Sequence, residues 1–555
     1  MPVTKSKQEV WEIFMKCNNK SIHIFSSVLI VLLASANAMV WAENIELPEV
    51  TTVISGETEK AGGDALPDFS DVLKLPNGSG DLQPQLPEAE AAENNDIAAG
   101  KNKPVEKSVY AEGLIGGGYP AFFTGNISVA RTIGASPFKF SFEHDSALGY
   151  AKHSVTEGYS DRTTKLSIEK EYKKNHLEWG ASGFYKSAAD GLQGKLVYAD
   201  SKIGLLNRDL YNAGGNISYS FDNGFSLGAM AGVDFYNRYP ETGCSQIKNV
   251  QYFSVAPSLF FRWQGYGFDT GFTAEYDYDT EFSENIIFPK SHRASFKIDL
   301  QWKNDIFRLY GNASAVVGKN IMDESVIVPF TLGVESSFPV YFSNRRLSLS
   351  AEGGIDSYKP KAFELEEKYK FTNENWNPLE ISEWYGKFNV SIPLKTTFTG
   401  TAGVEYRQTA YKNGRWQPDY EAKTPVYSFY QKDYKGLSTD FGLSYHQGIL
   451  GVSGSWHSNW MDCSARENVQ TVKVDVNIQD ENSKWGLDLN CTLPINSDMG
   501  TPVVNSEGFV RITQSVRAIL SLNDLIMLYK GETRNYAGQY EARGGSAALL
   551  LKFVF

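Results

Sequence analysis

The chain has 555 residues, of which 42% are hydrophobic and 21% charged, and its net charge is −12. The acidic balance argues against a nucleic-acid-binding protein, which needs a basic surface, and four cysteines are too few for a disulfide scaffold. Apart from a short run near the N-terminus, no stretch of 18 apolar residues occurs, which argues against a helical membrane protein.

Residues 1–42 are organised like a secretory signal peptide. Four lysines precede an apolar core, Ile24–Leu33, and small residues follow it. Val40 and Ala42 stand at positions −3 and −1 of one cleavage site, and a cut after Ala38 also fits. The alternative is an uncleaved anchor, for which the core is short. We therefore expect export across the inner membrane with removal of this segment.

Residues 43–106 form an acidic, proline-containing segment. Its 14 acidic and four basic residues give a net charge of −10, and its aromatic content is little more than Phe69. Such a composition cannot bury a core. We expect a disordered periplasmic tail.

One stretch of this tail has a pattern of its own. Directly after Leu47-Pro48 come Glu49, Val50, Thr51, Thr52, Val53 and Ile54. An acidic residue followed by threonine and β-branched residues resembles the TonB box of TonB-dependent receptors. The resemblance implies strand addition to a periplasmic energy-coupling protein. About 50 residues separate Gly56 from Lys107, too few for the conventional plug of those receptors. The alternatives are a plain spacer or another periplasmic partner.

From Lys107 to Phe555 the dominant hydrophobic period is two, which indicates β-strands. A typical segment is Phe296, Ile298, Leu300 and Trp302, alternating with Lys297, Asp299, Gln301 and Lys303. Such segments run about ten residues or more, the length that crosses a bilayer at a tilt. The alternation predicts that Leu300 and Val474 face lipid while Asp299 and Asp475 face the lumen.

Short turn signals alternate with longer polar connections along this region. Ten short signals lie near Gly134, Lys174, Asn223, Gly265, Asn304, Asn344, Lys395, Gly448, Asn482 and Asn523. Short turns on one side and long loops on the other are typical of outer-membrane barrels. Strands that cross a bilayer must form a closed barrel, because an open sheet edge would leave backbone polar groups without hydrogen-bond partners. The prediction is an all-β protein: a large transmembrane antiparallel β-barrel over residues 107–555, with about 22 strands, give or take two to four.

The last strand carries a second resemblance. Leu549, Leu551, Phe553 and Phe555 alternate with their neighbours, and the chain ends at the aromatic residue. This resembles the C-terminal signature of bacterial outer-membrane barrels. It implies that the barrel-assembly machinery recognises the strand ending in Phe555, and that the barrel lies in the lipid bilayer of the outer membrane.

Signals of catalysis are weak. The histidines have no metal-ligand spacing, and neither a Gly-x-Ser-x-Gly elbow nor a phosphate-binding loop occurs. Gly116-Gly117-Gly118 is better interpreted as a backbone feature of the first strand. A calcium site from Asp277, Asp279, Glu281 and Glu284 is an alternative that we do not favour. We expect no enzyme, no cofactor and no metal site.

Charged residues of two neighbouring strands are predicted to face the lumen. They are Asp269, Glu275, Asp277, Asp279, Arg293, Lys297 and Asp299. Opposed charges across a pore bias the passage of ions and solutes, and the carboxylates would make one mouth negative. The alternative is that these groups are merely solvated at the base of a loop.

The function expected from these features is an outer-membrane channel or transporter that passes small solutes through a polar lumen. One alternative is a TonB-coupled uptake barrel without a conventional plug. Another is a surface-exposed structural or adhesin barrel with a closed lumen.

Overall fold

The computed structural model describes residues 109–555 except 133, 135, 197–203, 241–246, 248, 284–289, 320–325, 341–342, 373–378, 412–413, 420–425, 462–469, 496–500 and 538. The predicted signal peptide, the acidic tail and the TonB-box-like stretch Glu49–Ile54 therefore lie outside the described residues. Among the described residues, no helix is both long and apolar enough to span a membrane.

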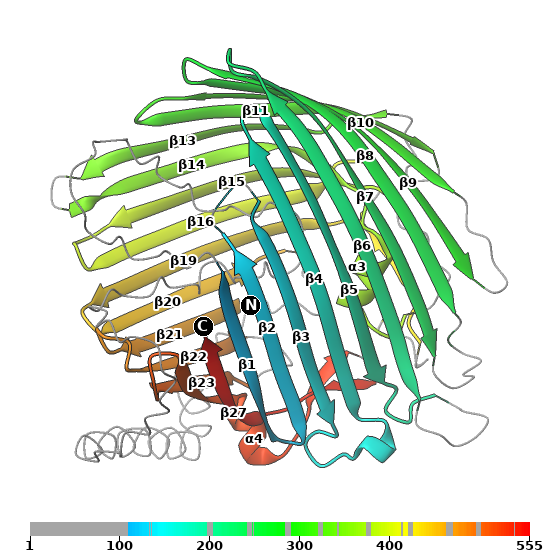
Figure 1. The fold of residues 1–555 in the computed structure, drawn as a ribbon, viewed down its shortest axis with the longest axis vertical. Coiled ribbons are helices and arrows are strands. Elements are labelled where there is room, and N and C mark those ends of the chain that lie inside the picture. Colours follow the sequence, from blue (N-terminus) through cyan, green and yellow to red (C-terminus); the bar gives the residue numbers. More distant parts are fainter. Residues whose placement is uncertain are drawn as a thin grey trace, which may run out of the picture. The chain divides into compact units, whose positions relative to one another are not determined.

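The fold is one closed antiparallel barrel (Figure 1), which confirms the predicted fold class. Its first eleven wall strands are β1 (Tyr110–Tyr119), β2 (Phe122–Arg131), β3 (Phe138–Leu148), β4 (Ser160–Lys174), β5 (Leu177–Gly191), β6 (Leu205–Ser220), β7 (Phe225–Pro240), β8 (Val250–Gly265), β9 (Phe268–Ser283), β10 (Ser291–Lys303) and β11 (Phe307–Lys319). The other eleven are β13 (Phe330–Val340), β14 (Ser343–Tyr358), β15 (Ile381–Pro393), β16 (Phe398–Thr409), β19 (Lys435–Gln447), β20 (Leu450–Asn459), β21 (Gln470–Gln479), β22 (Trp485–Ile495), β23 (Val503–Arg511), β24 (Val516–Asn523) and β27 (Ser546–Val554). The strand count of 22 therefore agrees with the prediction.

The remaining elements belong to the connections. They are the two-residue strand β12 (Val326–Ile327), the pairs β17 (Arg415–Pro418) with β18 (Phe429–Lys432) and β25 (Arg534–Ala537) with β26 (Tyr540–Ala542), and the short helices η3 (Val155–Glu157), α3 (Ala362–Lys368) and α4 (Leu525–Lys530). All of them lie in connections of one kind, the long ones, so the two ends of the barrel differ.

The barrel closes where β1 pairs with β27. Tyr119 stands opposite Ala547, and Glu112 opposite Val554. At this seam the two backbones run very close together. A Cβ atom on Gly118 would overlap the backbone oxygen of Ala547. The glycine run is thus a structural feature of the closure, because only a residue without a side chain fits there.

Nine of the ten predicted short turns fall where two successive wall strands meet. At one of them, Gly224 has a φ of 81°, a conformation that favours glycine. The tenth prediction, at Asn523, is wrong: β24 continues to that residue, and the turn lies at residues 512–515. The polar pair Asn523-Asp524 instead begins a helix, since the Asp524 side chain accepts a hydrogen bond from Met527 N (3.4 Å) in α4.

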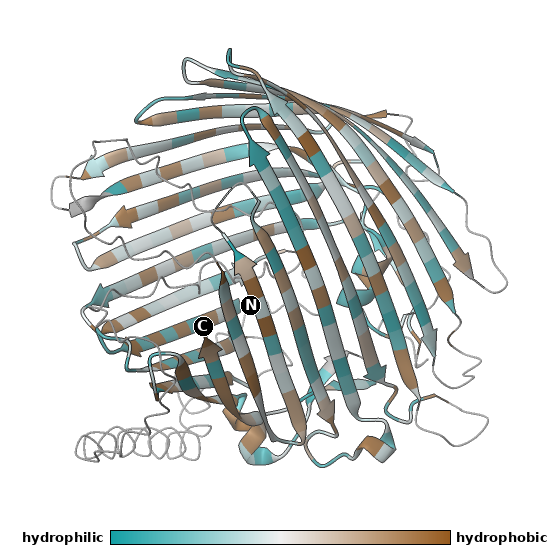
Figure 2. Cartoon of the chain, viewed as in Figure 1, coloured by the Kyte–Doolittle hydropathy of each residue, from teal (hydrophilic) through white to brown (hydrophobic). Residues whose placement is uncertain are grey.

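Each wall strand separates two kinds of side chain, which the banding of Figure 2 makes visible along the ribbons. On β10, Leu300 is 59% exposed, and Ile298 and Phe296 lie on the same outer face. The alternate residues Lys297 and Asp299 form an ion pair with each other (2.9 Å). An apolar belt exposed around a closed barrel is the surface that contacts lipid.

This alternation gives a stability prediction. Leu300→Arg is expected to lower the free energy of unfolding by roughly 2–4 kcal/mol, because it places a charge in the lipid-facing belt. The matched substitution Asp299→Leu, on the other face of the same strand, is expected to cost less. Urea unfolding in phospholipid vesicles measures both. An equal loss for the two variants would mean that the predicted register is shifted by one residue.

Strand length varies round the wall. Strands β4 to β9 have 15 or 16 residues each, whereas β20 to β24 have 8 to 11. The long arrows of β4 to β9 are apparent in Figure 1. We call these six long strands, together with the adjoining 13-residue β10, the tall wall.

Candidate functional site

Residues from widely separated connections meet in one apolar cluster, which we call the loop cap. Its members are Leu192, Leu196, Leu206, Ile247, Phe371, Tyr427 and Tyr540. Apart from Leu206, at the start of β6, they come from five different long connections. Phe371 stacks on Tyr540 with ring centroids 3.7 Å apart, and Tyr427 accepts a hydrogen bond from Gln539 N (2.8 Å). Segments that start all round a barrel can meet only above its axis, so the loop cap lies across one mouth.

The connection between β14 and β15 is described at residues 359–372 and 379–380. These described residues, which we call the lid, reach the tall wall. Its lysines contact aspartates on alternate strands: Lys359 with Asp279 of β9, Lys361 with Asp234 of β7, and Lys370 with Asp190 of β5. Its glutamates contact cations: Glu366 with Arg238 of β7, Glu367 with Lys186 of β5, and Glu380 with Arg293 of β10. The lid and the wall are therefore complementary in charge.

The Glu366–Arg238 pair is the most deeply buried of these contacts. The two side chains are 3% and 1% exposed, and Arg238 Nη1 donates to Glu366 Oε1 at 2.6 Å. The hydroxyl of Tyr236 donates to the other carboxylate oxygen, and Arg208 donates to the backbone oxygen of Glu366 (3.2 Å). Removing one member of a buried pair leaves an uncompensated charge and costs about 3–5 kcal/mol.

Apolar contacts support the same docking. Phe363 and Leu365 of α3 are buried with Tyr236 and Tyr252 of the wall. At the start of the lid, burial alone would lower the pKa of Lys361, but the Asp234 carboxylate raises it above its usual value. The ammonium therefore stays charged and the contact persists.

The residues predicted to face the lumen lie on one face of β9 and β10. Arg293 stands opposite Asp277 across the two strands and donates to it at 3.2 Å. Glu275 stands opposite Ser295 on the same face. Because Arg293 also contacts Glu380 of the lid, this face is the one turned towards the axis. The seven predicted residues share it, although their role in passage stays a prediction.

The structure does not gather these carboxylates at one mouth. Asp269 and Asp279 are ten residues apart on β9, and ten residues of strand span about 33 Å. Asp269 accepts from Arg262 Nε at 2.7 Å, while Asp279 contacts Lys359. The carboxylates at both ends of the strand thus have cationic partners, which weakens the negative potential expected at one mouth.

For the calcium alternative, Asp277 and Asp279 have cationic partners, and Glu284 lies outside the described residues. Within the part of the chain that the structure describes, no group of His, Cys, Asp and Glu side chains is arranged to hold a metal ion.

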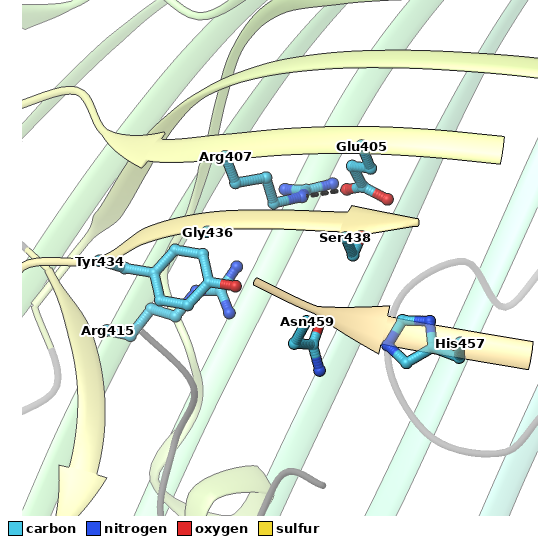
Figure 3. Close-up of a pocket in the computed structure, with 8 residues that line it drawn as sticks. All are labelled: Glu405, Arg407, Arg415, Tyr434, Gly436, Ser438, His457 and Asn459. Atoms are coloured by element: carbon cyan, nitrogen blue, oxygen red, sulfur yellow. Dashed lines mark hydrogen bonds and ion pairs between the residues drawn. The ribbon is translucent and has the colours of Figure 1, made fainter. Parts of the chain in front are cut away.

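A second polar region lies on the inner face of β16, β19 and β20. Figure 3 shows its cavity, of about 320 Å³. The lining residues are Glu405, Arg407, Arg415, Tyr434, Gly436, Ser438, His457 and Asn459. Behind them, the buried Glu383 accepts hydrogen bonds from Arg415 Nε (2.5 Å) and Arg415 Nη2 (3.0 Å). Arg407 donates to Glu405 and, at 3.4 Å, to Glu383.

Sequence reasoning missed both the lid contacts and this cavity. Residues 359–370 contain four lysines and three glutamates, and this density of charge was the available signal that the connection is more than a solvated loop. The arginines of the cavity come from a wall strand and from a connection, and their common partner Glu383 lies on another strand. No local pattern brings these three together.

The chain is similar in fold to known transporters and receptors of solved structure. Neither a protein-family model nor a curated protein matches the sequence. Among solved structures, the chain is similar to the FrpB iron transporter from Neisseria meningitidis (TM-score 0.62, 10% identity, covering 81% of this chain and 82% of that one). It is also similar to the siderophore receptor PirA from Pseudomonas aeruginosa (TM-score 0.59, 7% identity, 82% and 81%) and to the copper transporter OprC (TM-score 0.59, 10% identity, 80% and 80%).

The fold and these similarities define the class. The chain is a β-barrel of the outer-membrane type, closed by 22 strands. It has the same scaffold as these transporters and receptors.

Proposed function

We propose that this protein is an outer-membrane uptake barrel, which passes small solutes through a polar lumen after its lid has moved. The observation that carries the proposal is the docking of the lid on the inner face of the tall wall, with the Glu366–Arg238 pair at its centre. Together with the loop cap, the docked lid obstructs the mouth. A solute then enters only when these contacts open, and the charged groups of β9 and β10 line its path.

Ion conductance of the full chain in planar bilayers tests the proposal. Current steps that grow when the lid is released support a solute pathway. The alternative of a structural or adhesin barrel needs no such pathway. No current from a folded barrel with a released lid would therefore favour that alternative.

A second, more specific proposal is that uptake is energised from the periplasm. Two observations support it: the closed 22-strand scaffold similar to that of an iron transporter, a copper transporter and a siderophore receptor, and the stretch Glu49–Ile54 in the acidic tail. Extended β-branched sequence can add as a strand to a partner protein. In this proposal the partner pulls on the tail, which precedes β1 in the chain.

Deletion of residues 49–54 tests the coupling. The full chain in detergent is expected to be retained by the immobilised periplasmic domain of the energy-coupling protein. The deletion is expected to weaken retention at least about tenfold, because it removes the backbone groups that would pair. Deletion of residues 89–94, which have the same length and lie in the same tail, serves as the control. If both deletions bind alike, the box has no coupling role and passive passage remains.

A further inference from the structure

We propose, resting on the uptake function above, that the cavity in Figure 3 is a binding subsite for the oxyanion group, a carboxylate or a phosphate, of the transported solute. The two arginines of the cavity recognise the oxyanion. The site lies apart from the lid, on the inner face of β16, β19 and β20.

Buried Glu383 fixes the direction of both guanidinium groups. It holds Arg415 through Nε and Nη2 and Arg407 through Nη1. Among the hydrogen bonds of the described residues, none involves Arg415 Nη1 or Arg407 Nη2, and Arg407 Nη1 also lies 3.5 Å from Asp356 Oδ2. A carboxylate behind an arginine orients the guanidinium so that its other edge is available to a ligand. Arg415 presents such an edge, which matches the geometry of an oxyanion, whereas Arg407, held at Nε and Nη1, offers Nη2 alone.

The rest of the lining limits the arginines' freedom further. Arg415 lies over the ring of Tyr434, with its guanidinium carbon 3.4 Å from the ring centroid. Asp440 forms a hydrogen bond with His457 Nδ1 (2.7 Å) and so holds the imidazole at the cavity wall. Groups that are already held in place lose little conformational entropy when a ligand binds.

Donor geometry and size narrow the class of ligand. The charges of Arg407 and Arg415 are offset by Glu405, Glu383 and Asp356, so charge alone does not select the ligand. The available guanidinium nitrogens are hydrogen-bond donors, which match an acceptor such as an oxyanion and not a cation. An apolar solute is disfavoured because the lining is polar (Figure 3). The volume is about ten times that of one water molecule in the liquid. A small organic acid or a sugar phosphate therefore fits.

Calorimetric titration of the full chain in detergent provides the test, with glucose 6-phosphate, gluconate and glucose as probes. Binding of glucose 6-phosphate, gluconate or both, but not of glucose, is expected. Tighter binding of glucose 6-phosphate would identify the preferred oxyanion as a phosphate, and tighter binding of gluconate would identify it as a carboxylate. No binding of either acid, or equal binding of glucose, would overturn the proposal, because the arginines would then serve the structure alone.

Variants locate the binding within the cavity. Ser438→Leu fills the cavity without removing an ion pair, and is expected to weaken binding at least about tenfold. Ser444→Leu, on the same face of β19 but outside the cavity, is expected to bind like the unmodified chain. Arg407→Lys keeps the charge but removes the guanidinium Nη2 donor, and is also expected to weaken binding about tenfold. Equal affinities in all three variants would contradict the location.

The binding experiment and the conductance experiment can fail separately, so the subsite and the uptake function are tested independently. If the probes bind but the barrel with a released lid conducts no current, the subsite stands and the uptake function fails. If current flows but no acid binds, the uptake function stands and the subsite fails.

Discussion

Glu366→Ala is expected to open the barrel. The substitution leaves Arg238 buried without its carboxylate partner and removes the acceptor of Tyr236. The docked lid then loses about 3–5 kcal/mol, which shifts the equilibrium between docked and released lid by about two to four orders of magnitude. Planar-bilayer recordings are expected to show larger and more frequent current steps than those of the unmodified chain.

The neighbouring substitution Glu367→Ala is the matched control. Glu367 lies on the same helix, but its pair with Lys186 is partly exposed, at 38% and 30%, and such pairs contribute about 1 kcal/mol or less. Replacing both members of the buried pair, Glu366→Leu with Arg238→Leu, is expected to return the current towards the unmodified level, because no unpaired charge remains. Equal currents from Glu366→Ala and Glu367→Ala would show that the lid does not gate the lumen.

Gly118→Val is expected to prevent closure of the barrel. A side chain at this position overlaps the backbone of Ala547 in β27, so β1 and β27 must separate at the seam. Their backbone groups would then lose their partners, and in a bilayer each unpaired group costs several kcal/mol. The folded, heat-modifiable form seen on gels is expected to disappear from membranes.

Gly113→Val controls for the change of glycine to valine in β1. A Cβ at Gly113 has its nearest neighbour, Asn126 O, at 3.8 Å, an ordinary contact. This variant is expected to keep the folded form. If Gly118→Val also folds normally, the seam tolerates a wider spacing than its backbone positions indicate.

Much of the barrel wall was predictable from the sequence because every strand meets the same two constraints, a minimum length and an alternation of apolar and polar residues. A bilayer imposes one length and one alternation on each strand, so Leu300 and Asp299 already indicate opposite faces. The error at Asn523 has a physical cause: Asn and Asp favour both turns and helix N-caps. Residues 512–515 are a weaker turn signal, with neither glycine nor proline.

The inner contacts were not predictable for a different reason. Glu366 and Arg238 are 128 residues apart in the chain, and Glu380 and Arg293 are 87 apart. Period-two patterning says which face a residue occupies but not which partner it meets across the lumen. Three of the predicted charges, Asp277, Asp279 and Arg293, do belong to these contacts. The lid contacts also require a long connection to fold back onto the inner face of the wall, which the alternation within single strands does not predict.

The unequal strand lengths affect how the cell surface presents this protein. A strand of 16 residues, such as β6, rises about 40 Å along the membrane normal at a tilt near 40°, whereas the nine residues of β23 rise about 23 Å. The apolar belt is about 25 Å tall. One side of the rim therefore stands some 15 Å above the membrane while the other ends near its surface. A large particle that approaches the cell from outside would meet the long-stranded rim first, and the wall on the opposite side would be sheltered from it.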